Sequence, residues 1–214
     1  MAFSGKIYIV GCGLGAPEHL TREAISVVES SSVIAGHQRL LQLFPWFTGQ
    51  RIVFGADIQR GIDELDAARH MGKVAVLVSG DPGCYSLAKI ILRKFGEENC
   101  KVIPGISSVQ AAFARLCMEW VDAKIVSAHA ARPDEDVERA LMRERKIAIL
   151  LGGRDSIAWL LSFLKKYKQP KRIVVCQNLG LEEESITEVT ETELPRLTIS
   201  SRAVVILLAK EHSL

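Results

Sequence analysis

The stretch VAVLVSGDPGCYSLA (residues 74–88) joins an unbroken apolar run to a loop that holds an acid, a proline and two glycines. The apolar run at 74–78 predicts a strand that is buried on both faces, as strands of a parallel sheet are. In the following loop, Asp81 stands at the carboxyl end of that strand, where open α/β sheets place ligand-binding groups. An isolated Asp-Pro-Gly can also do no more than cap a helix that starts near Tyr85, so both roles of Asp81 stay open.

Short apolar runs alternate with helical patterns along the whole chain of 214 residues. Besides 74–78, strands are predicted at 6–10, 32–36, 100–104, 123–128, 146–151, 172–176 and 203–209. This alternation predicts an α/β protein in which helices flank mostly parallel sheets. The stretch 181–199 differs, because its β-branched and acidic residues predict a short exposed hairpin or edge strands. Thr21 is expected to cap the first long helix.

The segment MEWVDA (118–123) continues the preceding helical pattern poorly and reads as a linker. Four of the predicted strands precede it, and a second set begins directly after it. We therefore expect an N-terminal α/β domain at 1–118 and a C-terminal α/β domain at 119–214, each with a mostly parallel sheet.

Composition and charge exclude several classes of protein. Hydrophobic residues make up 48% of the chain and charged residues 24%, which is typical of a globular protein. The net charge of +2 is too small to argue for nucleic acid as the main partner. The longest apolar runs are far shorter than the roughly 18 residues that a membrane span needs. Because the chain enters a strand almost at once, we expect no signal segment and a cytoplasmic location.

The five cysteines form no Cys-x-x-Cys pair and are expected to be reduced. We therefore predict neither a disulfide framework nor a metal site. Cys100, Cys117 and Cys176 stand in or beside apolar runs and are expected to be small core residues.

Three loops that follow strands could form one binding cleft. The first has glycines at 11, 13 and 15, the second contains Asp81, and the third begins a helix with Ser107 and Ser108. The glycine loop also fits a permissive dinucleotide-binding pattern, but the second strand ends in IAGHQR and lacks the acid that holds the ribose. A nicotinamide-dependent oxidoreductase is thus a weaker alternative, as is a non-catalytic nucleotide-binding module.

In this order the loops VGCGLGAPEHLT (10–21), VSGDPGCYSLA (78–88) and VIPGISSVQAAFARL (102–116) resemble the motifs of the tetrapyrrole (corrin/porphyrin) methylase family. The resemblance extends over nearly the whole chain. It implies two α/β domains with S-adenosylmethionine in the cleft between them, S-adenosylhomocysteine as the product, and a homodimer.

Within this family, PGISSVQAAFARL, the stretch WVDAKIVSAHAARP (120–133) and the short length most resemble members that methylate C5 of a corrin-ring precursor in cobalamin biosynthesis. The substrate thus implied is precorrin-6Y or cobalt-precorrin-7. Some organisms fuse this activity to a C15-methylating decarboxylase, which this chain is too short to include. The resemblance therefore implies a free-standing enzyme with that decarboxylase as a candidate partner. Methylation at another ring position, of a modified histidine or of ribosomal RNA stays open, because substrate choice depends on the site and not on the fold.

Residue by residue, the resemblance places the cofactor against loops of both lobes. The implied cofactor-binding residues are Gly11, Gly13, Leu14, Asp81, Cys84, Ser107, Ser108, Leu151, Gly152, Asn178 and Leu179. Where related members have a glycine in Ser-x-His-Gly-Arg, this chain reads SAHAAR, with Ala130 and Ala131 before Arg132. This departure leaves the role of Arg132 open.

His129 is the first candidate for a general base, because a histidine can titrate near neutral pH and SAHAAR follows a predicted strand. Tyr85 is the second candidate. His129 can equally be structural or bind a carboxylate. Because a corrin precursor carries many carboxylates, Arg132, Arg154 and Arg115 are candidate substrate-binding residues, with a solvated surface position as the alternative for each.

Overall fold

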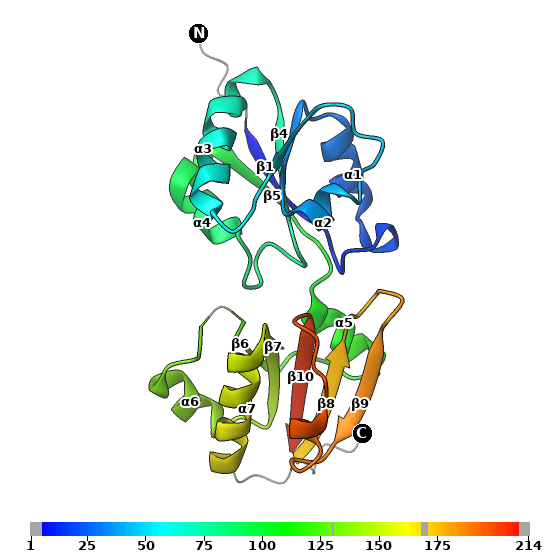
Figure 1. The fold of residues 1–214 in the computed structure, drawn as a ribbon, viewed down its shortest axis with the longest axis vertical. Coiled ribbons are helices and arrows are strands. Elements are labelled where there is room, and N and C mark those ends of the chain that lie inside the picture. The colour runs from blue at the N-terminus through cyan, green and yellow to red at the C-terminus, as the bar shows by residue number, and fades with distance from the viewer. Residues whose placement is uncertain (1–5, 130, 168–170, 210–214) are drawn as a thin grey trace. The chain divides into compact units, whose positions relative to one another are not determined.

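The computed structural model describes residues 6–129, 131–167 and 171–209 of the chain. It divides into two compact units, Met1–Ser107 and Ser108–Leu214. Each unit contains one five-stranded sheet with its own helices (Figure 1). This architecture confirms the predicted α/β class with two lobes. The division lies before helix α5 (Ser108–Arg115) and not after residue 118, because α5 packs against strand β10 (Ala203–Ala209) of the second unit.

The first sheet has the strand order β3-β2-β4-β1-β5, and all of its pairings are parallel. Its strands are β1 (Ile7–Gly11), β2 (Val33–Gly36), β3 (Gln50–Val53), β4 (Val74–Val78) and β5 (Cys100–Ile103). Four of them lie where the apolar runs predict. Strand β3 was not predicted, because Ile52 is its only buried residue and it therefore lacks an apolar run.

The helices of the first unit cover both faces of this sheet. They are α1 (Arg22–Glu29), α2 (Gln38–Leu41), α3 (Ile58–Ala68) and α4 (Ala88–Phe95), with short 3₁₀ turns at Pro17–His19, Arg69–Met71 and Glu97–Asn99. As predicted, Thr21 caps α1, since its Oγ1 accepts the N–H of Ala24 at 3.0 Å.

Helices α1 and α2 pack on one face of the first sheet, and α3 and α4 pack on the other. Strands β1 and β4 are neighbours, yet α1 and α4, which follow them, lie on opposite faces. The sheet therefore has a topological switch point between β1 and β4. In open α/β sheets, ligands bind beyond the carboxyl ends of the strands at such a point.

The second sheet has the strand order β6-β7-β10-β8-β9. The strands not yet defined are β6 (Lys124–Ser127), β7 (Lys146–Leu151), β8 (Lys171–Gln177) and β9 (Ser185–Val189). Only β6 and β7 pair in parallel, while β10 is antiparallel to β7 and β8, and β9 is antiparallel to β8. The prediction of a mostly parallel sheet is therefore wrong for this unit. A strand that is buried on both faces, such as β10, has the same apolar sequence whether it runs parallel or antiparallel to its neighbours. The sequence therefore does not indicate the direction of such a strand.

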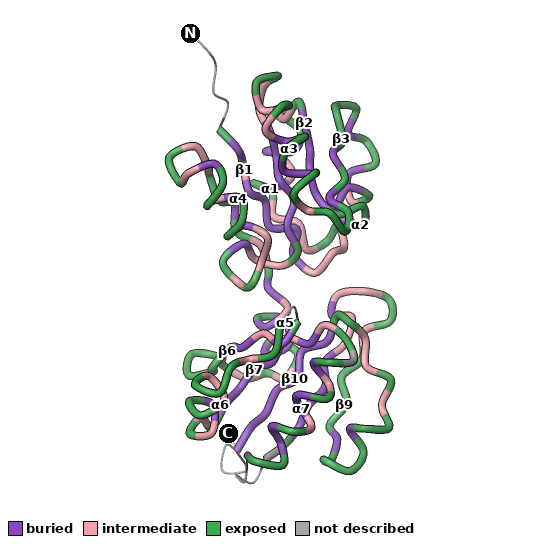
Figure 2. The backbone as a smooth tube through the Cα atoms, turned by 60° about the vertical axis from the view of Figure 1, so that its left-hand side comes forward, coloured by how far each residue is buried: buried purple, intermediate pink, exposed green. Residues whose placement is uncertain are grey.

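The predicted edge strand within 181–199 is confirmed by β9, whose residues are mostly exposed. Figure 2 contrasts β9 with β10, which is buried along its whole length. No hairpin forms within this stretch, because the residues after β9 turn into a 3₁₀ helix at Leu194–Arg196.

One large core joins the second sheet to α6 (Glu135–Leu141) and α7 (Arg154–Lys166). The rings of Trp159, Phe163 and Tyr167 stack along α7 with centroids 5.4 Å apart. Cys176 is buried as predicted, whereas Cys117 is exposed, because the chain leaves α5 there in a left-handed conformation with φ 52°.

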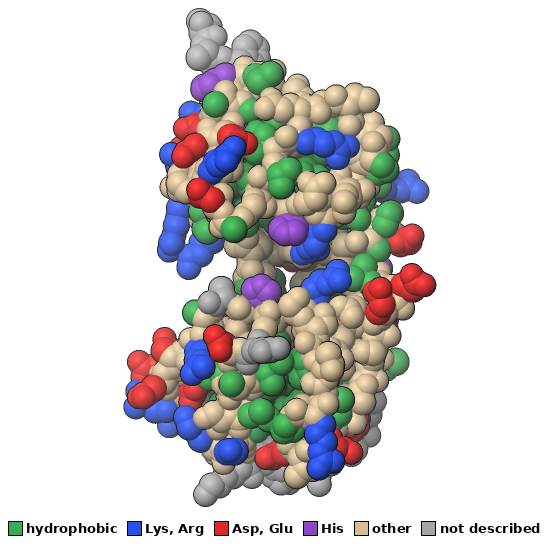
Figure 3. All heavy atoms as spheres, in the orientation of Figure 1, with side chains coloured by type: hydrophobic (Ala, Val, Ile, Leu, Met, Phe, Trp, Pro, Cys, Tyr) green, Lys and Arg blue, Asp and Glu red, His purple; other side chains and the backbone are tan. Residues whose placement is uncertain are grey.

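None of the helices in the described ranges is long and apolar enough to cross a membrane. Charged side chains of both signs are found on each unit on the face that Figure 3 shows, consistent with the small net charge.

Candidate functional site

The loops that follow β1 and β4 are joined backbone to backbone at the switch point. The N–H of Cys12 donates to the carbonyl of Val78 at 2.8 Å, which extends the ladder by one step. Gly13 and Gly80 then exchange two hydrogen bonds of 3.3 and 2.9 Å. Two of the three predicted loops therefore form one rigid rim.

The third loop, which follows β5, lies against this rim through Gly105. A Cβ atom built on Gly105 would lie 2.5 Å from the carbonyl oxygen of Gly80 and 2.8 Å from the carbonyl carbon of Gly11. Both distances are shorter than a Cβ atom tolerates, so only glycine allows the loops to approach this closely. The three predicted loops thus meet at one end of the first sheet.

Asp81 braces the same junction with both of its carboxylate oxygens. Oδ1 accepts the N–H of Gly83 at 2.8 Å, and Oδ2 accepts the N–H of Gly105 at 3.1 Å. The alternative that Asp81 only caps a helix is therefore wrong. Helix α4 begins at Ala88, and the hydroxyl of Ser86 accepts the Ala88 N–H at 3.1 Å.

The remaining predicted residues of the first unit belong to the same three loops. Ser107 is buried and Leu14 is half-buried, while Ser108, which follows Ser107, is the first residue of α5 and of the second unit. Burial and the nearby Asp81 carboxylate raise the pKa of the Cys84 thiol, so that this thiol stays protonated at neutral pH. Tyr85 has a φ of 49°, which is uncommon for a bulky residue, and is 63% exposed.

Strands β6, β7 and β8 point the same way, because β7 and β8 both run antiparallel to β10. Ala203 at the start of β10 lies opposite both Leu151 and Gln177, the last residues of β7 and β8. Six of the predicted residues of the second unit therefore gather at one edge of its sheet. They are His129 and Arg132 after β6, Leu151 and Gly152 at the end of β7, and Asn178 and Leu179 after β8.

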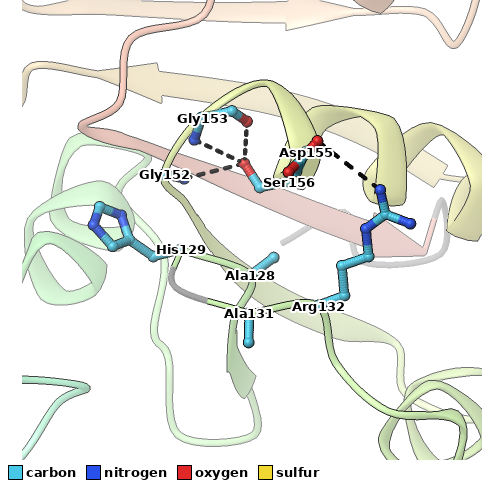
Figure 4. Close-up of a pocket in the computed structure, with 8 residues that line it drawn as sticks. All are labelled: Ala128, His129, Ala131, Arg132, Gly152, Gly153, Asp155 and Ser156. Atoms are coloured by element: carbon cyan, nitrogen blue, oxygen red, sulfur yellow. Dashed lines mark hydrogen bonds and ion pairs between the residues drawn. The ribbon is translucent and has the colours of Figure 1, made fainter.

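A cavity of about 320 Å³ opens at the ends of β6 and β7 (Figure 4). It is lined by Ala128, His129, Ala131, Arg132, Gly152, Gly153, Asp155 and Ser156. The Ser156 hydroxyl accepts the N–H groups of Gly152 and Gly153, both at 3.1 Å, and donates to the Gly153 carbonyl at 2.6 Å. Ser156 thereby fixes the turn into α7. This role was not predicted, because Ser156 takes the position of a capping box that is usually Glu or Gln, after an N-cap that is glycine.

His129 is oriented by the end of β7. Its Nδ1 lies 3.2 Å from the carbonyl oxygen of Leu151. Because a carbonyl oxygen only accepts, Nδ1 donates, and Nε2 of the neutral ring can accept a proton. In Figure 4 the His129 ring and the Arg132 side chain extend to opposite sides of their loop.

The three predicted arginines differ in their surroundings. Arg132 is 62% exposed and lies 4.0 Å from Asp155, itself 95% exposed, which makes a weak ion pair. Arg115 donates instead to Glu184 at 2.7 Å, and this contact raises the pKa of its guanidinium. Arg154 begins α7, but its side chain lies outside the described residues, as does Ala130.

Gly152 has no room for a side chain, because a Cβ atom there would lie 2.5 Å from Nδ1 and 2.7 Å from Cα of His129. We expect Gly152→Ala to displace the His129 loop and lower the free energy of unfolding by about 1–3 kcal/mol. Thermal unfolding measures the stability, and NMR of the imidazole signal reports on the ring.

Gly153→Ala is the matched control, since a Cβ atom there meets nothing within 4 Å and its φ of 176° is extended. As Gly153 is the N-cap of α7, this variant should lose about 1 kcal/mol and leave the His129 signal in place. An unmoved His129 signal in Gly152→Ala would contradict the prediction.

Among the described residues, no group of three or more His, Cys, Asp or Glu side chains could hold a metal ion.

Comparison with known proteins gives consistent matches. The family model for tetrapyrrole (corrin/porphyrin) methylases matches residues 6–195. The cobalt-precorrin-7 C(5)-methyltransferase of Salmonella typhimurium is 30% identical over 179 residues, which cover 83% of this chain and 87% of that protein. The solved structure of precorrin-6Y methylase from Archaeoglobus fulgidus is 26% identical, with a TM-score of 0.72 over 96% of this chain and 98% of its own. A uroporphyrin-III C-methyl transferase from Thermus thermophilus, solved with S-adenosylhomocysteine, shares the fold at 22% identity, with a TM-score of 0.76 over 95% of this chain and 92% of its own.

Proposed function

We propose, because the chain belongs to the tetrapyrrole (corrin/porphyrin) methylase family, that it is an S-adenosylmethionine-dependent C-methyltransferase of cobalamin biosynthesis. The proposed reaction is methylation of C5 in a corrin precursor, either precorrin-6Y or cobalt-precorrin-7. The observation that carries this proposal is the similarity to a relative named for that reaction, which extends over most of the chain. Methylation at another ring position is the second candidate within the same family.

The loop junction of the first unit fits an S-adenosyl cofactor. It lies at a topological switch point, and its rim is backbone, so polar groups of a ligand can approach it without meeting side chains. Strand β2 ends at Gly36 and is followed by His37, where dinucleotide-binding folds have an acid for the ribose. This difference argues against a dinucleotide-binding site of the usual kind.

The residues proposed to bind this cofactor are those that the family resemblance implies. They are Gly11, Gly13, Leu14, Asp81, Cys84 and Ser107 of the first unit, and Ser108, Leu151, Gly152, Asn178 and Leu179 of the second. The braced position of Asp81 supports a role in shaping the loops, in addition to any contact with the ligand.

When bound, S-adenosylmethionine supplies a methyl group that is already electrophilic. The protein then has to hold that group in line with the attacking ring carbon, and orientation of this kind can contribute about 7–11 kcal/mol. We propose that Nε2 of His129 accepts a proton from the substrate, because Nδ1 is engaged with the Leu151 carbonyl. Tyr85 is the second candidate, supported by its exposed ring.

Arg132 is the arginine best placed to bind a substrate carboxylate, since it lines the cavity and its ion pair with Asp155 is weak. Arg154 stays a second proposal from its position at the start of α7. Arg115 stays a third proposal, although its guanidinium already donates to the Glu184 carboxylate.

Isothermal titration with S-adenosylhomocysteine tests the cofactor, with NAD as the comparison ligand. The wild type should bind S-adenosylhomocysteine, and Gly13→Val should not. Gly13 has a φ of 59°, and a Cβ atom there would lie 2.5 Å from the carbonyl oxygen of His19. Preference for NAD, or equal binding by the variant, would count against the proposed cofactor site.

A second assay tests the position of methylation. The protein is incubated with ¹³C-methyl-labelled S-adenosylmethionine and either corrin precursor, and NMR locates the label in the product. A label at C5 supports the proposal, and a label at another ring carbon favours the second candidate.

The family resemblance also predicts a homodimer and a separate C15-methylating decarboxylase as a partner, and the sequence analysis predicts a cytoplasmic location. We propose all three. Sedimentation velocity tests the first, and co-purification with that decarboxylase tests the second.

A further inference from the structure

One carboxylate joins the turn after β8 to the end of α5. Glu184 stands directly before β9, and its Oε2 accepts the N–H of Gly180 at 2.6 Å. The same carboxylate receives Arg115, with Nε at 2.7 Å from Oε1 and Nη2 at 3.4 Å from Oε2. The Glu184 side chain is only 24% exposed, so this paired contact is partly shielded from water.

The turn that Glu184 holds has an uncommon backbone conformation. Asn178 has a φ of 49° and Gly180 a φ of 76°, both in the left-handed region. Four further contacts fix Asn178. Its carbonyl accepts the N–H of Leu181 at 2.9 Å, and its Oδ1 accepts the Ser200 hydroxyl at 2.9 Å. Its own N–H donates to the carbonyl of Arg202 at 3.2 Å, and its Nδ2 donates to the carbonyl of Glu183 at 3.4 Å. Asparagine and glycine adopt the left-handed region more readily than other residues, but both also adopt other conformations, so these contacts select this conformation of the turn.

We propose that Glu184 is a positioning residue for the cofactor, which keeps the Asn178–Gly180 turn in its binding conformation before the cofactor arrives. In this role Arg115 acts through Glu184. This inference rests on the proposed function, in which Asn178 and Leu179 contact the cofactor. Helix α5, which Arg115 ends, begins at Ser108, another proposed contact, so Glu184 links two of the binding segments.

Titration of S-adenosylhomocysteine against four variants tests this role. Glu184→Ala removes both contacts and should weaken binding by about tenfold, as loss of a hydrogen bond to a charged group does. Glu184→Gln keeps an acceptor for the Gly180 N–H, and Arg115→Gln keeps the Glu184 carboxylate, so each should lose about threefold. These two milder variants decide the question if Glu184→Ala does not fold.

The matched control is a second arginine–glutamate pair of the same unit, which joins strands β8 and β9. Arg172 on β8 and Glu188 on β9 also meet through paired contacts, with the shortest at 2.8 Å. No backbone N–H of the turn is among these contacts. Glu188→Ala should therefore leave the affinity unchanged.

Hydrogen exchange in the cofactor-free protein gives a second measurement, which reports on the conformation of the turn independently of the affinity. The amide of Gly180 should exchange faster in Glu184→Ala than in the wild type, and at the wild-type rate in Glu188→Ala. Unchanged affinity and exchange in Glu184→Ala would overturn the positioning role alone. Weaker binding without faster exchange would also overturn it and indicate direct contact with the cofactor. A wild type that does not bind S-adenosylhomocysteine would overturn the proposed function, and this inference with it.

Discussion

Gly105→Ala should reduce the affinity for S-adenosylhomocysteine by about 100-fold, which corresponds to a loss of about 3 kcal/mol of binding free energy. The added Cβ would lie 2.5 Å from the carbonyl oxygen of Gly80 and 2.8 Å from the carbonyl carbon of Gly11. All of these atoms are backbone, so no side-chain rotation can relieve the overlap, and the loops must separate. The free energy of unfolding should fall by about 3 kcal/mol for the same reason.

Gly55→Ala is the control for this prediction, because a Cβ atom on Gly55 of the same unit meets nothing within 4 Å. Titration calorimetry and thermal unfolding of both variants supply the measurements, with circular dichroism to verify that each is folded. A folded Gly105→Ala that binds within about threefold of the wild type would show that the loops accommodate a methyl group without loss of function.

Asp81→Asn is the second large expected effect. The carboxylate accepts one N–H on each oxygen, from Gly83 and from Gly105. An asparagine has one acceptor oxygen, so its amide group must face one of those N–H donors and leave it unsatisfied. Such a loss costs about 1–3 kcal/mol, and we expect both the stability and the cofactor affinity to fall, the affinity by about 10–100-fold.

Asp57→Asn controls for the general effect of replacing an aspartate. Asp57 caps α3 by accepting a single N–H, from Arg60 at 3.1 Å, and asparagine is an equally good cap. This variant should unfold and bind like the wild type. If Asp81→Asn lost affinity with unchanged thermal stability, Asp81 would be a ligand of the cofactor and not a brace between loops.

Most of the fold could be predicted because the strands are buried runs with sharp limits. The run at 74–78 and the run at 203–209 both coincide with observed strands. The direction of the second of these strands was not predictable, because burial on both faces is compatible with a parallel or an antiparallel neighbour. The division into units was placed too late, because the pattern of α5 does not indicate which sheet the helix covers.

The sequence predicted which loops form the candidate site, but it did not predict the contacts between them. Parallel strands end at one edge of a sheet, so loops that follow them must meet, and this much is a consequence of topology. The brace from Asp81 to Gly105 spans 24 residues, and the pair of Arg115 and Glu184 spans 69. Contacts at such separations leave no local pattern, and this is why neither of these two contacts was predicted.

The strand order of the second sheet also has a consequence for synthesis on the ribosome. Strand β10 lies between β7 and β8, and it is the last strand of the sheet in the chain. Until it is translated, β6–β7 and β8–β9 can exist only as two separate ribbons, each of which exposes an edge and an apolar face. The first unit, whose strands all precede residue 104, can assemble while the second is still being made. The nascent second unit is therefore the part of this protein that most needs protection by chaperones before release.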